Sequence, residues 1–238
     1  MKAKKQKDWS IFIIAFVVFL IWQLPSLGII RYPFILLGTW FHEMSHGLTS
    51  IFLGGSFHHL EIYETGGGVA YTSQDIEGFI PYRVRRALVA AGGLMGPCIF
   101  GAGLIIASAK PNRSVWFLRG LIILMVASIL IWIRSLIGTA ILSLIALILI
   151  IVSSRKSKKL AQWTLLFLGI QCTFSTYLQL NYLFTGTFVR HGQVNTSDTQ
   201  VIAESLFGTY WFWAIIIICI SAYVLFKSYS YYLRSKVS

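Results

Sequence analysis

Five consecutive residues, His42-Glu43-Met44-Ser45-His46, form the pattern H-E-x-x-H within an apolar stretch. On a helix, residues four positions apart share one face, so both imidazoles can reach one metal ion. Glu43 lies between them and can take a proton from an attacking water molecule. These residue types at this spacing indicate a metal-dependent hydrolase. The competing interpretation is a polar cluster that joins helices without a metal.

A catalytic zinc ion takes three protein ligands and keeps one position open, so the two histidines need a third partner. The chain has only eight acidic residues, which makes elimination possible. It leaves Asp198 as the first candidate and Glu204 as the second, in the polar segment before the last apolar run. Asp198 could instead cap the helix that follows it, and His191 could reach the metal from the same segment. The acidic residues set aside belong to the basic tail, the motif or the segment after the motif: Asp8, Glu43, Glu61, Glu64, Asp75 and Glu77.

The composition indicates that these residues belong to a membrane protein. Hydrophobic residues make up 56% of the chain and charged residues 12%, whereas a soluble domain carries about 25% charged residues. The net charge of +12 does not form a nucleic-acid-binding stripe. The basic residues gather between apolar runs, as topology signals and contacts with anionic lipid do. These basic segments lie at residues 2–7, 83–86, 155–159 and 227–236.

We expect an all-α polytopic membrane protein with about seven transmembrane helices, in a single domain over residues 1–238. Residues 1–9 would form a basic cytoplasmic tail, and the first two spans a helical hairpin with Arg31 and Tyr32 in its turn. Seven spans put the basic residues 155–159 outside, against the positive-inside rule, whereas fusing 115–152 into one element removes that conflict. The expected spans cover roughly residues 10–30, 33–53, 86–109, two within 115–152, 160–180 and 209–227.

Residues 55–82 have a different character from the spans. Two β-type runs flank Gly66-Gly67-Gly68, which predicts an interfacial β-hairpin after the motif helix. Helical substrates must unwind before cleavage, and an exposed strand edge can hold the extended form by β-augmentation. The three glycines are therefore candidate substrate-binding residues. The alternative is an ordinary connecting hairpin.

The order of these features resembles a known family. His42-Glu-Met-Ser-His46 within a span, a short β-hairpin, and then Ala90-Ala-Gly-Gly-Leu-Met-Gly-Pro97 resemble the site-2 protease family of intramembrane zinc metalloproteases, in its compact branch without a PDZ domain. The resemblance implies Zn²⁺ bound by His42 and His46, with Glu43 as catalytic base. In better-known branches the third ligand is the aspartate of an Asp-Gly motif. This sequence has no Asp-Gly dipeptide, so Asp198 rests on position and elimination.

The expected function is that of an intramembrane zinc metalloendopeptidase that cleaves membrane-anchored proteins. We expect a multi-pass protein of the plasma membrane, in contact with lipid and not with nucleic acid. One alternative is a catalytically inactive scaffold or chaperone that binds single-span partners. Another is an ion transporter, which predicts an internal repeat that the sequence does not contain.

Overall fold

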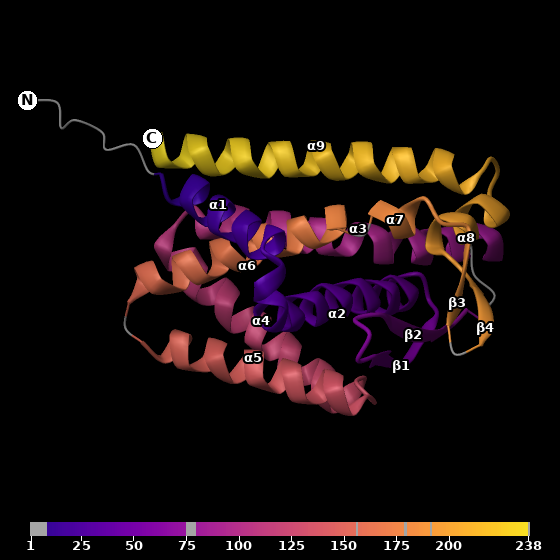
Figure 1. Cartoon of the computed structure of the whole chain (residues 1–238), viewed down its shortest axis with the longest axis horizontal. Helices are drawn as coiled ribbons and strands as arrows, with labels where there is room; N and C mark the ends of the chain where they lie inside the picture. The colour runs from indigo at the N-terminus through magenta and orange to yellow at the C-terminus, as the bar shows by residue number, and fades with distance from the viewer. Residues whose placement is uncertain (1–8, 75–79, 156, 179, 191, 238) are drawn as a thin grey trace, which may run out of the picture.

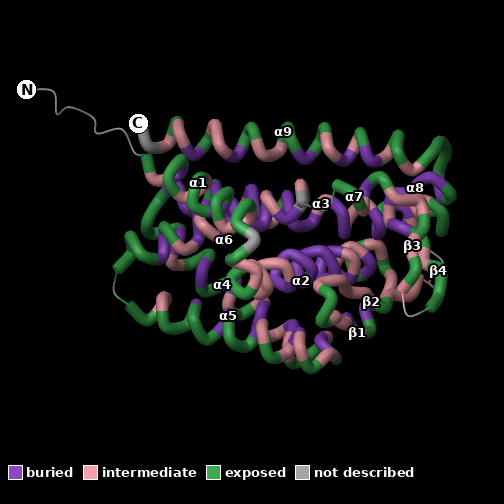
Figure 2. Tube along the Cα trace, in the orientation of Figure 1, coloured by how far each residue is buried: buried purple, intermediate pink, exposed green. Residues whose placement is uncertain are grey.

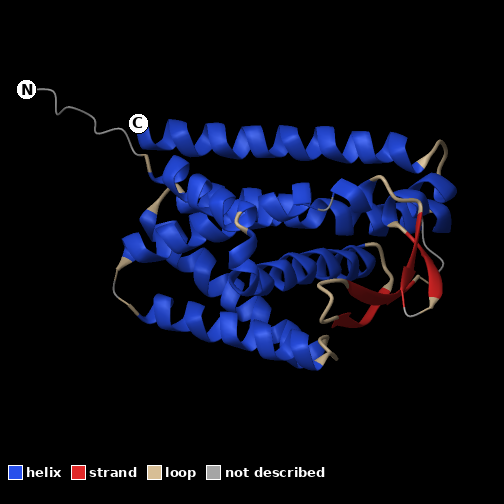
Figure 3. Cartoon of the chain, viewed as in Figure 1, coloured by secondary structure: helices blue, strands red, loops and turns tan. Residues whose placement is uncertain are grey.

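The computed structural model describes residues 9–74, 80–155, 157–178, 180–190 and 192–237. The described chain is mostly helical, with two small antiparallel hairpins (Figure 3). In chain order the elements are α1 (Ser10–Gln23), a 3₁₀ turn (Pro25–Leu27), α2 (Gly28–Phe52), β1 (Ser56–Ile62), β2 (Gly68–Ser73), α3 (Tyr82–Ser108), α4 (Pro111–Ile131), α5 (Leu136–Ser154), α6 (Lys158–Leu178), α7 (Leu180–Leu183), β3 (Thr187–Arg190), β4 (Gln193–Thr196), α8 (Asp198–Ser205) and α9 (Tyr210–Val237).

Helix α3 is the central element, and it packs against α2, α4, α6, α8 and α9 (Figure 1). Its close approach to α2 depends on glycines. A Cβ atom at Gly93 would overlap the His46 ring, and one at Gly96 would overlap the Ser45 hydroxyl. The small residues of this segment therefore let the motif helix lie directly against α3.

The outer helices present apolar side chains to the surroundings. On α4 the side chains of Ile123 and Leu130 are 68% and 73% exposed, and on α9 Phe226 is 67% exposed. Exposed residues recur along α5 and α9 (Figure 2). Helices that are apolar all round and only partly buried are suited to contact with lipid.

The number of spans differs from the expected seven. Four described helices, α3, α4, α5 and α9, are long and apolar enough to cross a membrane, or five if α1 and α2 count as one broken span. Helix α1 has 14 residues, which at about 1.5 Å each do not cross a hydrocarbon core of roughly 30 Å. The axes of α1 and α2 are bent by 109° at the 3₁₀ turn. Arg31 and Tyr32 lie within α2, so the predicted hairpin turn at these residues is wrong.

The two ends of the described chain lie at the same end of the molecule (Figure 1). Ser10 at the start of α1 and Tyr232 near the end of α9 have hydroxyl oxygens 3.1 Å apart. Arg86, near the start of α3, lies at the opposite end, where it pairs with Glu204 of α8 at 3.8 Å. The motif helix α2 ends at this second end, beside the hairpins (Figure 1).

The first hairpin matches the predicted one in place and in its glycine turn. Strands β1 and β2 pair antiparallel, with Leu60 opposite Ala70. In the link between α4 and α5, the Trp132 carbonyl accepts the Leu60 N–H, and the Arg134 N–H donates to the Leu60 carbonyl. In an antiparallel ladder, two residues directly opposite each other either both direct their N–H and C=O groups at the partner strand or both direct them away from it. Ala70 therefore directs its N–H and C=O away from β1, so β2 presents an outer edge. Gly66 has a φ of 93°, a conformation that favours glycine at the turn.

The segment 181–208, expected as a polar loop, contains regular structure. Strands β3 and β4 form a second hairpin, and α8 follows it directly. The base of this hairpin is fixed because Ser197 donates its N–H to the Gly186 carbonyl, and the Thr199 hydroxyl donates to the Leu183 carbonyl. The segment thereby brings α8 to the side of α2 that carries the motif.

Candidate metal centre

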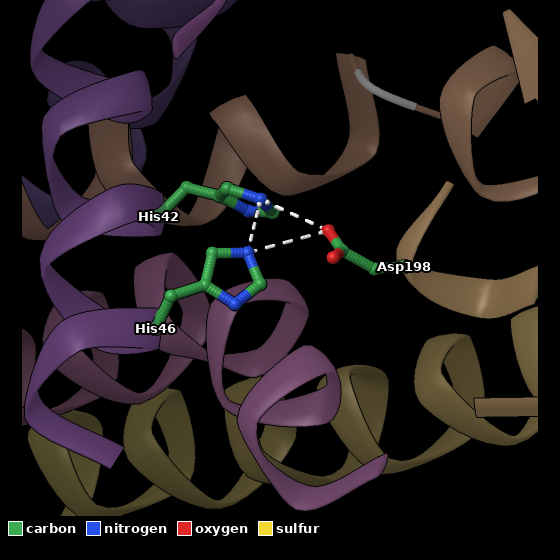
Figure 4. Close-up of side chains that lie close together, drawn as sticks. All are labelled: His42, His46 and Asp198. Atoms are coloured by element: carbon green, nitrogen blue, oxygen red, sulfur yellow. Dashed lines mark hydrogen bonds and ion pairs between the residues drawn. The ribbon is translucent and has the colours of Figure 1, made fainter. Parts of the chain in front are cut away.

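His42 and His46 lie one helical turn apart on α2 and point toward the first residue of α8, Asp198 (Figure 4). The two Nε2 atoms are 3.0 Å apart. Oδ2 of Asp198 lies 3.1 Å from Nε2 of His42 and 3.4 Å from Nε2 of His46. Ligands about 2.0–2.1 Å from a tetrahedral zinc ion would lie roughly 3.3 Å from one another. The three atoms thus form one face of a tetrahedron of the size that zinc requires.

A hydrogen bond to the backbone of α3 orients the His46 ring so that Nε2 faces the other two candidate ligands. Nδ1 of His46 lies 2.8 Å from the Val89 carbonyl oxygen, so it carries the proton and donates it. A neutral imidazole that donates from Nδ1 has a lone pair on Nε2. Nε2 is thereby available as a metal ligand, and the donor set of two imidazoles and a carboxylate suits zinc.

Asp198 is held by neighbours that leave its carboxylate directed at the histidines. Ser197, not Asp198, caps α8, because the Ser197 side chain accepts the N–H of Gln200 at 3.3 Å. The capping interpretation of Asp198 is therefore wrong. The Tyr182 hydroxyl donates to Oδ2 of Asp198 at 3.1 Å and lies 3.3 Å from the Asp198 backbone N–H, which donates to it.

The charge of Asp198 is stabilised by the same contacts. Burial alone would raise the pKa of this carboxyl group. Attraction to His46 and hydrogen bonds with both imidazoles outweigh burial, and they hold the pKa of Asp198 well below its usual range. The carboxyl group is therefore in the ionised form that metal binding requires.

Glu43 is buried, with 5% of its surface exposed, and it lines the same cavity as the three candidate ligands. This cavity has a volume of about 200 Å³, which holds several water molecules at roughly 30 Å³ each. A second cavity, reached past His46 and Asp198, is lined by polar residues that include Gln74 and Arg86. Water therefore has a polar route toward the carboxylate of Glu43.

The glycine turn lies on the other side of Glu43. Gly66, Gly67 and Gly68 line a third cavity together with His42 and Glu43. A Cβ atom at Gly68 would come within 2.9 Å of the Glu43 Cγ atom, so this position must stay small. The predicted substrate-binding glycines are therefore close to the candidate base.

The other candidate ligands from the sequence were Glu204 and His191. Glu204 pairs with Arg86 and accepts a hydrogen bond from Gln200, and it is outside the cluster. His191 lies outside the described residues.

Sequence reasoning did not find two side chains that line the cavity. Tyr182 holds Asp198, and Arg190 reaches from β3 to the glycine turn. Neither residue belongs to a motif. The only available signal was their place in the polar segment that also contains Asp198.

The comparison with protein families gives one result. A family model described as Peptidase M50B-like matches residues 11–228. The match includes the motif, both hairpins and Asp198. No curated protein and no solved structure was found to match the chain.

Proposed function

Because the chain belongs to the Peptidase M50B-like family, a family of metallopeptidases, we propose that it is an intramembrane zinc metalloendopeptidase acting on membrane-anchored proteins. The observation that carries this proposal is the convergence of His42, His46 and Asp198 beside a buried Glu43. Together these residues supply three ligands and a base at one place. The family assignment favours a hydrolase over the scaffold and transporter alternatives.

In this proposal the two histidines and Asp198 hold the zinc ion. A bound zinc ion supplies an activated water and polarises the scissile carbonyl. Glu43 takes the proton from the attacking water and passes it to the leaving amine. Tyr182 keeps the Asp198 carboxylate in place through its hydroxyl. The Val89 carbonyl fixes the His46 ring in the tautomer that leaves Nε2 free.

The outer edge of β2 is the proposed place for the substrate backbone. Ala70 directs its N–H and C=O away from β1, and it lines the cavity that contains His42, Glu43 and His46. A peptide segment that adds to this edge would be held extended across the site. The unwound segment would then present its carbonyl group to the metal and to Glu43.

We further propose six membrane crossings, with α1 and α2 as one broken span and α6 as another. An even number of crossings is supported by the contact of Ser10 with Tyr232, which puts both ends of the described chain on one side. Arg113 contacts Tyr231 at the same end, and the α5–α6 connection lies there too (Figure 1). The positive-inside rule makes this end cytoplasmic. The described basic residues at this end are Lys110, Arg113, Arg155, Lys158, Lys159 and Arg234, and in the sequence four lysines precede α1.

The site then lies toward the opposite, extracytoplasmic side of what we propose to be the plasma membrane. This assignment removes the conflict over residues 155–159, because they come to lie on the same side as the N-terminal lysines. It puts the basic residues 83–86 on the extracytoplasmic side, against the positive-inside rule.

Removal of the metal tests the proposed function. Purified protein is reconstituted into lipid vesicles with a single-span substrate, and cleavage is followed by gel and mass spectrometry. Treatment with a zinc chelator should abolish cleavage, and added Zn²⁺ should restore it. Unchanged cleavage in protein verified to be free of metal would contradict the proposal.

A further inference from the structure

Arg190 reaches across the site from the end of β3 to the glycine turn of the other hairpin. Its Nη1 atom donates a hydrogen bond to the Gly68 carbonyl at 2.6 Å. The guanidinium carbon lies 5.3 Å from the centre of the Tyr63 ring and 5.1 Å from that of Phe188. A Cβ atom at Gly67 would come within 3.0 Å of Nη2, so the turn leaves room for the guanidinium group. These contacts fix the position of the charge.

Arg190 has no carboxylate partner within the part of the chain that the structure describes. The ion pairs found there join other residues. Among the described residues that line the cavity of about 200 Å³, Arg190 is the one lysine or arginine. Asp198 lines it too but is engaged with both histidines. Glu43 forms no ion pair with Arg190, although their opposite charges attract each other at longer range. No described carboxylate is in contact with this partly buried guanidinium group, so an anionic group from outside the chain would be bound favourably.

The position of Arg190 relates it to the substrate edge. The Gly68 carbonyl points away from β1, as the groups of Ala70 do, and Arg190 already occupies it. A substrate strand would therefore pair with β2 from Ala70 onward. The substrate residue one position closer to the glycine turn would then meet the guanidinium group of Arg190. That residue adjoins the scissile bond, because Gly68 lies against Glu43.

We propose that Arg190 is a specificity-determining residue that selects substrates with an acidic side chain next to the cleaved bond. The inference rests on the proposed peptidase function. Guanidinium N–H groups that are not bound to Gly68 would form paired hydrogen bonds with the substrate carboxylate. A neutral side chain would leave the charge of Arg190 without a partner, and a lysine would be repelled.

The test uses a single-span substrate of known cleavage site. Glu, Gln or Lys is placed in turn at each of the three positions on either side of the bond, and kcat/KM is measured in vesicles. Wild-type protein should prefer Glu over Gln at one position by about tenfold or more, the discrimination expected for a hydrogen-bonded charge pair. The preference should disappear in Arg190→Gln and change to Lys in Arg190→Glu. The matched control is Arg86→Gln, which removes a cation from the neighbouring cavity and should keep the preference.

A binding measurement separates this inference from the proposed function. In Glu43→Gln protein, which should bind without cleaving, the same peptides are compared by Kd. The Glu peptide should bind about tenfold more tightly than the Gln peptide, and the difference should be lost when Arg190→Gln is added. Cleavage of all peptides without any acidic preference would overturn the role of Arg190 and leave the peptidase function intact. Persistence of the preference in Arg190→Gln protein that retains zinc would overturn it as well.

Discussion

At the scale of single residues, the candidate centre combines two imidazoles with one carboxylate. His42 and His46 supply two of the three atoms of the tetrahedral face, and Asp198 supplies the third. Tyr182 donates to the same oxygen of Asp198 that faces the histidines. The direction of that carboxylate is therefore set from both sides, which is the arrangement expected of a supported metal ligand.

Replacement of Asp198 by Asn should weaken zinc binding by at least about a hundredfold, because the variant loses an anionic ligand and not merely a supporting contact. Bound zinc is measured by competition with a chelator of known affinity. The matched control is Glu204→Gln, an acidic residue of the same short helix that lies outside the cluster. Equal zinc affinity in the Asp198→Asn variant and in the wild type would rule out Asp198 as a ligand.

The sequence predicts the positions of the two histidines directly, but it gives weaker signals for the other residues of the site. Helix periodicity alone predicts that His42 and His46 share a face, because they lie within one helical turn. Asp198 lies far along the chain, and only the scarcity of acidic residues pointed to it. Its capping alternative failed because Ser197 performs that role. Tyr182 and Arg190 are common residue types in a polar segment, so nothing in their spacing indicated a contact with the site.

At the scale of elements, the motif helix is positioned by glycine contacts. A Cβ atom at Gly93 of α3 would overlap the His46 ring, so the contact between α2 and α3 requires the absence of a side chain there. The same contact brings Val89, one turn earlier on α3, to Nδ1 of His46. The packing of two helices thereby sets the orientation of a candidate ligand.

Substitution of Gly93 by Ala should therefore displace His46, lower zinc affinity and destabilise the fold by about 1–3 kcal/mol, as overpacking does. Zinc competition and thermal unfolding in detergent measure the two effects. Gly103→Ala is the control, because this glycine lies on the same helix with nothing within 4 Å of an added Cβ. If Gly93→Ala behaves like Gly103→Ala in both measurements, the contact with Gly93 does not position the histidine.

The edge of β2 gives a second prediction for an element. Ala70→Pro removes the N–H that points away from β1, and an edge position tolerates proline there. Loss of one hydrogen bond to the substrate should lower kcat/KM by roughly tenfold, while zinc content stays the same. Ala70→Val keeps the N–H and should cleave at nearly the wild-type rate. Full activity of a zinc-loaded Ala70→Pro variant would exclude pairing of substrate with this edge.

The two hairpins show what sequence patterns reveal about elements. Residues 56–73 combine β-type runs with a glycine turn, so the first hairpin was predicted. Strands β3 and β4 have four residues each. Strands of this length are too short to show a clear alternation of apolar and polar residues in the sequence. Two spans were predicted within residues 115–152, and the structure has two helices there, Pro111–Ile131 and Leu136–Ser154. The bend between α1 and α2 was not foreseen, because hydropathy records apolar length and not direction.

At the scale of the whole molecule, charge and shape agree on an orientation. Both ends of the described chain meet at one end of the molecule, and the candidate centre lies toward the other end (Figure 1). Most of the lysines belong to sequence segments at or next to the first end, whereas the second end contains Asp198 and Glu204 together with Arg86. This balance supports our proposal that the site lies in the extracytoplasmic half of the membrane.

Labelling of single cysteines in intact cells with a membrane-impermeant maleimide tests this orientation. The exposed Cys219 is first replaced by Ser. Val194→Cys, on the second hairpin, should be labelled from outside, and Ser157→Cys, between α5 and α6, only after the cells are opened. Seven crossings predict the reverse for both positions, so the opposite labelling pattern would reject the six-span arrangement.

The turnover of Glu43→Gln protein shows whether Glu43 acts as the base of a zinc peptidase. The variant keeps the shape of the side chain and all three candidate ligands. Wild-type and variant protein, both verified to contain zinc, are compared on a membrane-anchored substrate in vesicles. We expect the variant to bind zinc as the wild type does and to lose at least about a hundredfold in kcat, the usual contribution of a general base. Wild-type turnover by the zinc-loaded variant would contradict the account.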